Sequence, residues 1–115
     1  MQRKTVALRA LDSASLFLRK QFRVLRSGRT KDDGTPVSDA DDGSEERIIR
    51  VLRKSFPDDA ILSEECGELP GKSGYRWILD PLDGTANFLA GIPIFGILLA
   101  LAKEEEVLLS FCVFP

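Results

Sequence analysis

The chain has 115 residues and a formal net charge of −2, from 16 basic and 18 acidic side chains, and it contains no histidine. This balance argues against a nucleic-acid-binding surface. The missing histidine excludes His-based catalytic triads, HExxH zinc sites and phosphohistidine chemistry.

Hydrophobic residues make up 43% of the chain and charged residues 30%, as in an ordinary globular domain. Apolar runs stay shorter than a membrane span, and the first ten residues lack a signal-peptide core, so a cytoplasmic location is the default expectation. Cys66 and Cys112 are too few for a disulfide framework and lack the spacing of metal ligands.

The first half of the chain predicts two helices joined by a short ribbon. Apolar residues recur at helical spacing over Thr5–Ser27, and Gly28 ends this first helix. Its expected core stripe consists of Val6, Leu8, Leu11, Leu16, Leu18, Phe22 and Leu25. Asp33-Gly34 is a hairpin-turn signal within 31–41, and Ser44 has the character of an N-cap for a second helix that runs to about Ser55.

The second half of the chain predicts strands. Ala60–Ser63 is a short strand leading into an acidic loop, and Tyr75–Leu79 is the central strand. Phe95–Ala102 and Val107–Val113 predict a hairpin of largely buried strands. The expected fold is α+β, with two helices packed on a mostly antiparallel sheet. Its last strand would present an apolar edge that favours association, including a homo-oligomer.

The stretch WILDPLDGTANF, residues 77–88, carries most of the candidate chemistry. Asp80 and Asp83 follow an apolar run, and the adjoining proline and glycine impose a turn. Both carboxylates and the Leu82 carbonyl would then face one small space, and such hard oxygen ligands suit Mg²⁺ or Mn²⁺. Taken singly, either aspartate would more often be a turn or cap residue.

A short helix is expected directly after this turn, over Thr85–Ala90. The backbone amides of Gly84 and Thr85 would open it, and N–H groups at such an opening favour a phosphate oxygen. Metal ligands and a phosphate-binding turn so close together outline a hydrolytic phosphatase site.

The D-P-L-D-G-T sequence, with W-I-L before it and A-N-F after it, resembles the first signature of the inositol monophosphatase family. The resemblance covers nearly the whole chain and implies the N-terminal part of that fold over residues 1–115. It implies hydrolysis of a small phosphorylated alcohol by a metal-activated water. The cofactor would be two or more Mg²⁺ ions, with Mn²⁺ as an alternative. Inositol monophosphate and histidinol phosphate both remain open as substrates.

The same resemblance assigns roles to individual residues. The implied metal ligands are Glu64, Asp80, the Leu82 carbonyl and Asp83. Glu64 would also orient the attacking water, with Glu65 as a supporting second acid. Without the family, the acidic loop that carries both would be read as solvated surface.

Thr85 and Asp41 are implied to position the attacking water. Asp41 ends a K-x-D-G-x-P-V-S-x-A-D stretch that the family shares, and Lys31 begins it and would lie near the site. Without the resemblance, Asp41 would be read as part of an acidic surface turn. Thr85 could also be read as a nucleophile, but no base is available to activate it.

The chain departs from the family in length. Family members carry a second signature, W-D-x-A-A-G, in a C-terminal half, and Trp77 is the only tryptophan here. The sequence therefore predicts an N-terminal portion without its C-terminal part. Two hypotheses follow: a Mg²⁺-dependent phosphatase, or a truncated, catalytically incomplete homologue that binds metal or phosphate or acts only as an assembly piece.

Overall fold

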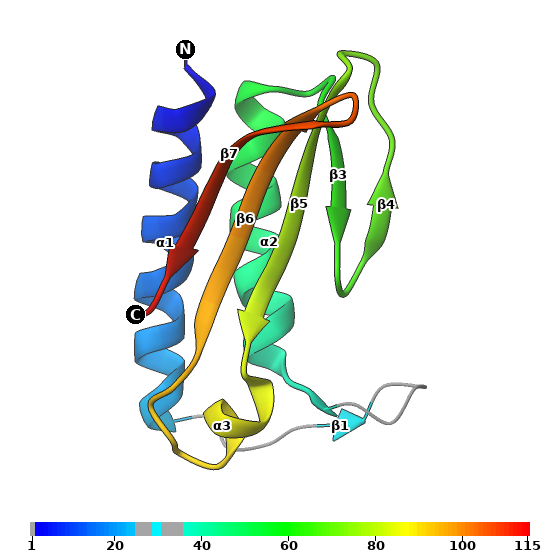
Figure 1. Ribbon diagram of the computed structural model, residues 1–115. Coiled ribbons are helices and arrows are strands. Elements are labelled where there is room, and N and C mark those ends of the chain that lie inside the picture. Colours follow the sequence, from blue (N-terminus) through cyan, green and yellow to red (C-terminus); the bar gives the residue numbers. More distant parts are fainter. Residues whose placement is uncertain (1, 25–28, 31–35) are drawn as a thin grey trace.

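The structure is a computed structural model that describes residues 2–24, 29–30 and 36–115. Two long helices, α1 (Arg3–Val24) and α2 (Asp39–Ser55), lie side by side on one face of a five-stranded sheet (Figure 1). The remaining elements are β1 (Arg29–Thr30), β2 (Pro36–Val37), β3 (Ala60–Ser63), β4 (Gly67–Leu69), β5 (Tyr75–Asp83), α3 (Thr85–Leu89), β6 (Gly96–Lys103) and β7 (Glu106–Val113).

The sheet has the strand order β4-β3-β5-β6-β7, with β5 at its centre. Only β3 and β5 pair in parallel, and every other neighbouring pair is antiparallel. The predicted α+β fold, with two helices on a mostly antiparallel sheet, is confirmed. The short β4 was not predicted, because a three-residue strand is too brief to show alternation.

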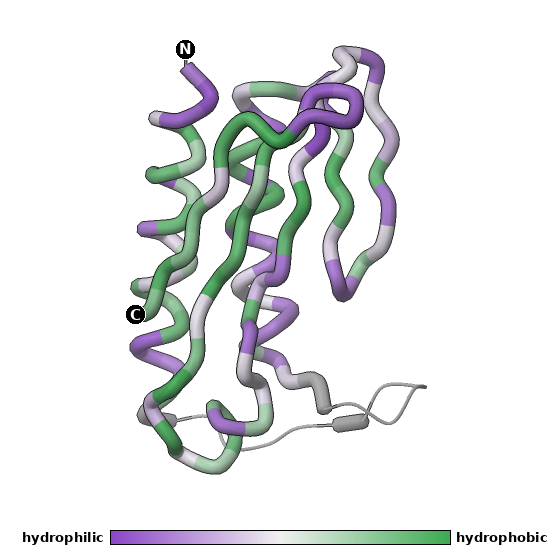
Figure 2. The backbone as a smooth tube through the Cα atoms, viewed as in Figure 1, coloured by the Kyte–Doolittle hydropathy of each residue, from purple (hydrophilic) through white to green (hydrophobic). Residues whose placement is uncertain are grey.

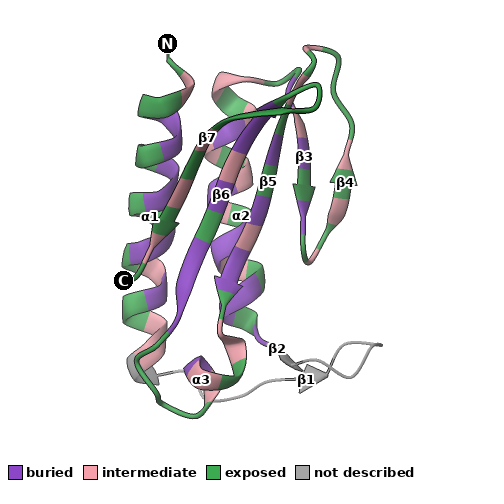
Figure 3. Ribbon diagram, viewed as in Figure 1, coloured by how far each residue is buried: buried purple, intermediate pink, exposed green. Residues whose placement is uncertain are grey.

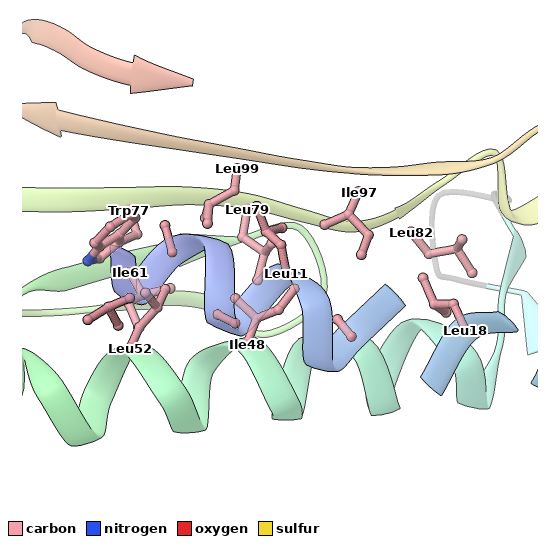
Figure 4. Close-up of a cluster of buried hydrophobic side chains, with 14 of the residues drawn as sticks. Leu11, Leu18, Ile48, Leu52, Ile61, Trp77, Leu79, Leu82, Ile97 and Leu99 are labelled. Carbon is pink, nitrogen blue, oxygen red and sulfur yellow. The ribbon is translucent and has the colours of Figure 1, made fainter. Parts of the chain in front are cut away.

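The core fills the space between the two helices and the sheet (Figure 4). Leu11 and Leu18 from α1 and Ile48 and Leu52 from α2 meet the inner face of the sheet, and all four are at most 1% exposed. The sheet contributes the side chains that alternate inward along its central strands: Ile61, Trp77, Leu79, Ile97 and Leu99. Burial of this kind contributes roughly 1.5–3 kcal/mol per large apolar side chain.

The predicted stripe of α1 is confirmed in part. Leu8 and Leu16 are 45% and 54% exposed, so their assignment to the core was wrong. The positions that face the core are instead occupied by small residues, Ala7, Ala10 and Ala14, which are fully buried. The physical reason is the helical period: residues 8 and 16 lie off the buried face, and alanines allow close packing of helices.

Within the described residues, helices cover one face of the sheet. On the opposite face, Leu62, Ile78 and Leu98 are 36–40% exposed. They line a groove of about 650 Å³ on this face, together with side chains of β7. β7 is apolar along much of its length (Figure 2), yet it is mostly exposed or half-buried (Figure 3). The prediction of a largely buried final hairpin was therefore wrong for β7, which is an edge strand, as expected of the last strand.

The N-terminus of α1 is fastened to the sheet through Asp59. The Arg3 guanidinium donates from Nε and Nη2 to the two Asp59 oxygens, each at 2.9 Å. Ser73 Oγ and Trp77 Nε1 also donate to this carboxylate, at 2.7 and 3.0 Å. The rings of Phe56 and Tyr75 lie 4.4 and 3.7 Å from the guanidinium carbon. This anchor explains why α1 begins at Arg3, two residues before the predicted Thr5.

The Asp59 network also determines the protonation of its carboxyl group. Burial raises the pKa of Asp59, but the hydrogen bonds from Arg3, Ser73 and Trp77 and the Arg3 charge outweigh burial, so the pKa lies below 3.8. The same pairing raises the pKa of Arg3. Asp59 is therefore ionised at neutral pH.

Within the part of the chain that the structure describes, no helix is long and apolar enough to cross a membrane. The predicted end of α1 at Ser27-Gly28 and the turn at Asp33-Gly34 lie outside the described residues. The ribbon expected around that turn is present in the paired strands β1 and β2.

Candidate active site

The two aspartates of the DPLDGT motif are placed by a β-bulge in β5. Asp80 pairs with Leu98 and Asp83 with Gly96, which leaves Pro81 and Leu82 together opposite a single residue of β6. Both of these are buried, whereas Asp80 is half-buried and Asp83 exposed. In a regular strand, residues three apart face opposite sides. The extra residue of the bulge brings both carboxylates to the outer side of the sheet.

This bulge corrects the predicted end of the central strand at Leu79. β5 continues through the motif to Asp83. Proline cannot donate a hydrogen bond to a neighbouring strand and is tolerated inside a sheet at a bulge. Pro81 therefore marks an irregularity within the strand, not its end.

Glu64 lies beside Asp80 because β3 is a parallel neighbour of β5 and ends where β5 reaches Leu79. Ser63 pairs with Leu79, and the Glu64 amide donates to the Leu79 carbonyl at 3.0 Å. The pKa of Asp80 is raised to about 7, first by burial, then by the charge of Glu64 and a hydrogen bond with it, and then by the charge of Asp83. The Leu82 amide, 3.3 Å from Asp80 Oδ1, opposes this rise. Three acidic side chains are thus close enough to influence one another.

The carboxylates do not form a ready-made cage. Among the described residues, no three His, Cys, Asp or Glu side chains are grouped closely enough to hold a metal ion as they stand. The donor chemistry nevertheless fits a hard divalent cation, because burial and the neighbouring carboxylates raise the pKa of Asp80 and a cation would stabilise its ionised form. Glu64, Asp80, Asp83 and the Leu82 carbonyl remain predicted ligands.

Thr85 and Asp41 are 44 positions apart in the chain but form a hydrogen bond with each other. Thr85 Oγ1 donates to Asp41 Oδ1 at 2.9 Å and lies 3.2 Å from the Leu82 carbonyl oxygen. Asp41 is 1% exposed, and its other oxygen accepts from the Ser38 amide at 3.0 Å and from Ser38 Oγ at 2.6 Å. The interpretation of this aspartate as part of an acidic surface turn is therefore wrong.

Ser38 and Asp41 form a capping box at the start of α2. The helix therefore begins at Asp39, and the predicted N-cap at Ser44 was wrong, since it lies more than one turn after the observed N-cap. Ser44 is fully buried within α2, and its hydroxyl donates to the Pro81 carbonyl at 2.7 Å. The S-x-x-D spacing of residues 38–41 was the available signal for the earlier start, and it was missed because Asp41 had been assigned to the ribbon.

Gly84 joins the bulged strand to α3. Its φ of 86° is in the left-handed region, and it is the N-cap of Thr85–Leu89, so the short helix predicted over Thr85–Ala90 is confirmed. A Cβ atom at Gly84 would lie 2.9 Å from the Ile94 carbonyl oxygen. Binding of phosphate by the amides of Gly84 and Thr85 remains a prediction.

Replacing Gly84 with alanine is expected to lower the free energy of unfolding by about 1–2 kcal/mol through its backbone conformation alone. Contact with the Ile94 carbonyl should add to this loss. Gly74→Ala is a matched control, because Gly74 has a φ of 87° and nothing within 4 Å of its added Cβ. Urea unfolding of both variants measures the difference. Equal losses would show that the approach to Ile94 contributes nothing.

Two further predicted site residues are Glu65 and Lys31. Glu65 is half-buried in the turn between β3 and β4. Lys31 lies outside the described residues. Sequence reasoning did not single out Glu45, which is 9% exposed and accepts hydrogen bonds from Ser63 Oγ at 2.6 Å and from the Cys66 amide at 2.9 Å. Its burial could not be inferred from sequence spacing, because its partners are 18 and 21 positions away.

Relatives of known sequence align with most of this chain. The chain is 43% identical over 86 residues to a histidinol-phosphatase of Chlorobaculum parvum, an alignment that covers 75% of this chain and 33% of that protein. It is 39% identical over 100 residues to a fructose-1,6-bisphosphatase/inositol-1-monophosphatase of Aquifex aeolicus, covering 85% of this chain and 38% of that one.

Solved structures have the same fold. The SuhB protein of Bartonella henselae superposes with a TM-score of 0.93 at 33% identity, over 97% of this chain and 45% of that chain. The IMPase of Thermotoga maritima superposes with a TM-score of 0.87 at 32% identity, over 100% of this chain and 45% of that chain. The chain thus spans less than half the length of these relatives.

The pattern of the family described as "Inositol monophosphatase family" matches residues 2–115, which is nearly the whole chain. The match includes the bulged DPLDGT strand, the Glu64 turn and the Asp41 cap. The chain belongs to the inositol monophosphatase family.

Proposed function

We propose that this chain takes part in the Mg²⁺-dependent hydrolysis of a small phosphate monoester by a metal-activated water. The observation that carries the proposal is the arrangement at the end of β5. There, a bulge turns Asp80 and Asp83 to the same side, Glu64 lies beside them, and Thr85 follows with its hydroxyl held by Asp41.

Two or more Mg²⁺ ions, with Mn²⁺ as a substitute, would be held by Glu64, Asp80, Asp83 and the Leu82 carbonyl. Such ions lower the pKa of bound water and stabilise charge on phosphoryl oxygens. The carboxylates suit this role because they already raise the pKa of Asp80, and a cation would relieve that repulsion.

Thr85 and Asp41 would orient the attacking water. Ser38 Oγ accepts a hydrogen bond from the Asp41 amide, so its own proton is directed to Asp41 Oδ2. The Thr85 proton is likewise directed to an acceptor, either Asp41 Oδ1 or the Leu82 carbonyl. The Thr85 oxygen therefore keeps lone pairs that can accept a hydrogen bond from the attacking water. The amides of Gly84 and Thr85 are proposed to contact the phosphate.

The substrate class follows from the relatives. Those named above are a histidinol-phosphatase and a fructose-1,6-bisphosphatase/inositol-1-monophosphatase. Each of these names describes a phosphatase that acts on a phosphate ester of a small alcohol. We therefore propose this class of ester as the substrate of the chain, with inositol monophosphate and histidinol phosphate as the candidates. The proposal includes the cytoplasmic location expected from the sequence, which cell fractionation tests.

Phosphate release by the purified chain is expected to require Mg²⁺ and to fall to background in Asp83→Asn. Inositol monophosphate, histidinol phosphate and a nucleotide 3′-phosphate are the substrates to compare. Asp12→Asn is the control, because it removes the same charge from an exposed position on α1. Release that is independent of Mg²⁺, or unchanged in Asp83→Asn, would contradict the proposal.

The alternative is a catalytically incomplete homologue that binds metal or phosphate, or that serves only in assembly. One observation favours it: the described carboxylates do not form a metal cage as they stand. Mg²⁺ binding without phosphate release, from a chain shown to be folded by circular dichroism, would support this alternative.

A further inference from the structure

One face of helix α2 carries three polar residues that are buried against the candidate site. Asp41, Ser44 and Glu45 are spaced by three and four positions, which places them on the same side of the helix. They are 1%, 0% and 9% exposed. Asp41 contacts Thr85, Ser44 contacts Pro81, and Glu45 contacts the turn that carries Glu64.

Glu45 holds this turn on both sides of Glu64. Its Oε2 atom accepts from Ser63 Oγ at 2.6 Å and from the Cys66 amide at 2.9 Å. Ser63 directly precedes Glu64, and Cys66 is two residues after it. Ser63 is 2% exposed and points inward, whereas Glu64 is exposed on the outer side next to Asp80. The anchor and the carboxylate it would position therefore lie on opposite faces of the sheet.

Ser44 holds the other side of the site in the same way. Its Oγ donates to the Pro81 carbonyl at 2.7 Å, and Pro81 directly follows Asp80 inside the bulge. Neighbouring residues of one rigid helix thus contact the two segments that carry Glu64 and Asp80. A shift of α2 would move both segments together and preserve their separation.

We propose that Ser44 and Glu45 are positioning residues that set the separation of the Glu64 and Asp80 carboxylates, with Glu45 fixing the Glu64 turn and Ser44 fixing the bulge. This inference rests on the proposed function, because that function makes Glu64 and Asp80 metal ligands. The effect of Ser44 and Glu45 on the local backbone can be tested separately. A buried carboxylate is costly unless it is hydrogen-bonded. Ser63 Oγ and the Cys66 amide, which donate to Glu45, belong to the strand end and turn that carry Glu64.

The first test is amide hydrogen exchange measured by NMR on the full chain. Glu45→Ala is expected to speed exchange of the Glu64 and Cys66 amides by roughly tenfold, because the loss of a hydrogen bond frees the turn to open locally. Amides of β6 should keep their protection. Glu46→Ala is the matched control, since Glu46 is the exposed neighbour and pairs with Arg50 on the outer side of α2. Glu45→Gln keeps an acceptor oxygen and should restore much of the protection.

The second test is Mn²⁺ affinity by isothermal titration calorimetry. Loss of a direct hydrogen-bond partner of a metal ligand typically weakens metal binding by about 10–100-fold. Ser44 and Glu45 contact residues close to the proposed ligands and not the ligands themselves. We therefore expect a loss at the lower end of this range, about tenfold, in Glu45→Ala and in Ser44→Ala, and wild-type affinity in Glu46→Ala. If Glu45→Ala does not fold, Ser63→Ala removes only one of the two hydrogen bonds and is used in its place.

The outcomes separate this inference from the proposed function. Faster local exchange with weaker Mn²⁺ binding supports both. If the wild-type chain binds no Mn²⁺, the proposed metal site fails, and the exchange data alone decide whether Glu45 positions the turn. Exchange at Glu64 and Cys66 that matches the Glu46→Ala control would overturn the inference. So would Mn²⁺ affinity that Glu45→Ala and Ser44→Ala leave unchanged.

Discussion

Replacing Asp59 with alanine is expected to lower the free energy of unfolding by about 3–5 kcal/mol, the range for breaking a buried ion pair. Asp59 is 1% exposed and accepts from Arg3, Ser73 and Trp77. The variant would leave the fully buried Trp77 Nε1–H without its acceptor and would release the N-terminus of α1 from the sheet. Urea unfolding followed by circular dichroism measures the loss.

The matched control is Asp58→Ala, which removes the same side chain from the exposed neighbouring position. Asp59→Asn should fall between the two, since an amide oxygen can still accept while the ionic attraction to Arg3 is lost. A loss in Asp59→Ala no larger than that in Asp58→Ala would show that the Arg3 network does not stabilise the fold.

The pH dependence of stability is expected to report the same network. The pKa of Asp59 lies below 3.8 in the folded protein, so between that folded pKa and about 3.8 the unfolded chain binds more protons. Stability therefore rises with pH across this window. The contribution of Asp59 is fully present above it and is lost as the pH falls through the folded pKa. The difference between wild type and Asp59→Asn should accordingly shrink below about pH 4.

Replacing Thr85 with valine is expected to reduce Mg²⁺-dependent phosphate release by about 10²–10⁴-fold, the usual contribution of a positioned proton-transfer group. Valine keeps the shape of threonine but removes the hydroxyl that joins Asp41 to the Leu82 carbonyl. Thr85→Ser keeps the hydroxyl and should retain most of the activity. Initial rates at saturating Mg²⁺ measure the effect.

Stability measurements separate this effect from a folding defect. Thr85→Val removes the donor to Oδ1 of the buried Asp41, which costs about 1–3 kcal/mol of stability. Because Asp41 retains both hydrogen bonds from Ser38, the variant should still fold, and rates are compared under conditions where urea unfolding shows it to be fully folded. Wild-type rates in Thr85→Val would exclude Thr85 from the positioning of water and leave Asp41 as a helix cap alone.

The backbone turn and the candidate ligands of the DPLDGT motif could be predicted from the sequence. The left-handed Gly84, the helix opened by Thr85 and the nearness of Asp80 and Asp83 all depend on residues within a few positions of one another. Turn and cap preferences act over the same distance, so the sequence carried them. The α+β fold could also be predicted. Helical spacing of apolar residues in the first half and strand-like apolar runs in the second half both mark the side chains that pack into one core.

The contacts that α2 makes with distant segments could not be predicted from the sequence. Asp41 reaches Thr85 across 44 positions, Ser44 reaches Pro81 across 37, and Glu45 reaches Ser63 across 18. No periodic pattern encodes such pairs, and each of these polar residues suits a solvated surface equally well. The exposure of β7 was misread for a related reason, because apolar composition does not reveal whether another layer covers a strand.

The family, the fold class and the motif with the candidate ligands could all be predicted from the amino-acid sequence, because periodic spacing and a turn of proline, glycine and two aspartates reflect local backbone preferences. The way in which that motif is presented depends on the packing of distant segments. The bulge at Pro81 and Leu82 turns both aspartates outward, and the parallel pairing of β3 with β5 brings Glu64 beside them. The buried polar face of α2 then holds both segments in place. These features depend on strand register and helix packing, which arise only when segments distant in sequence form one core.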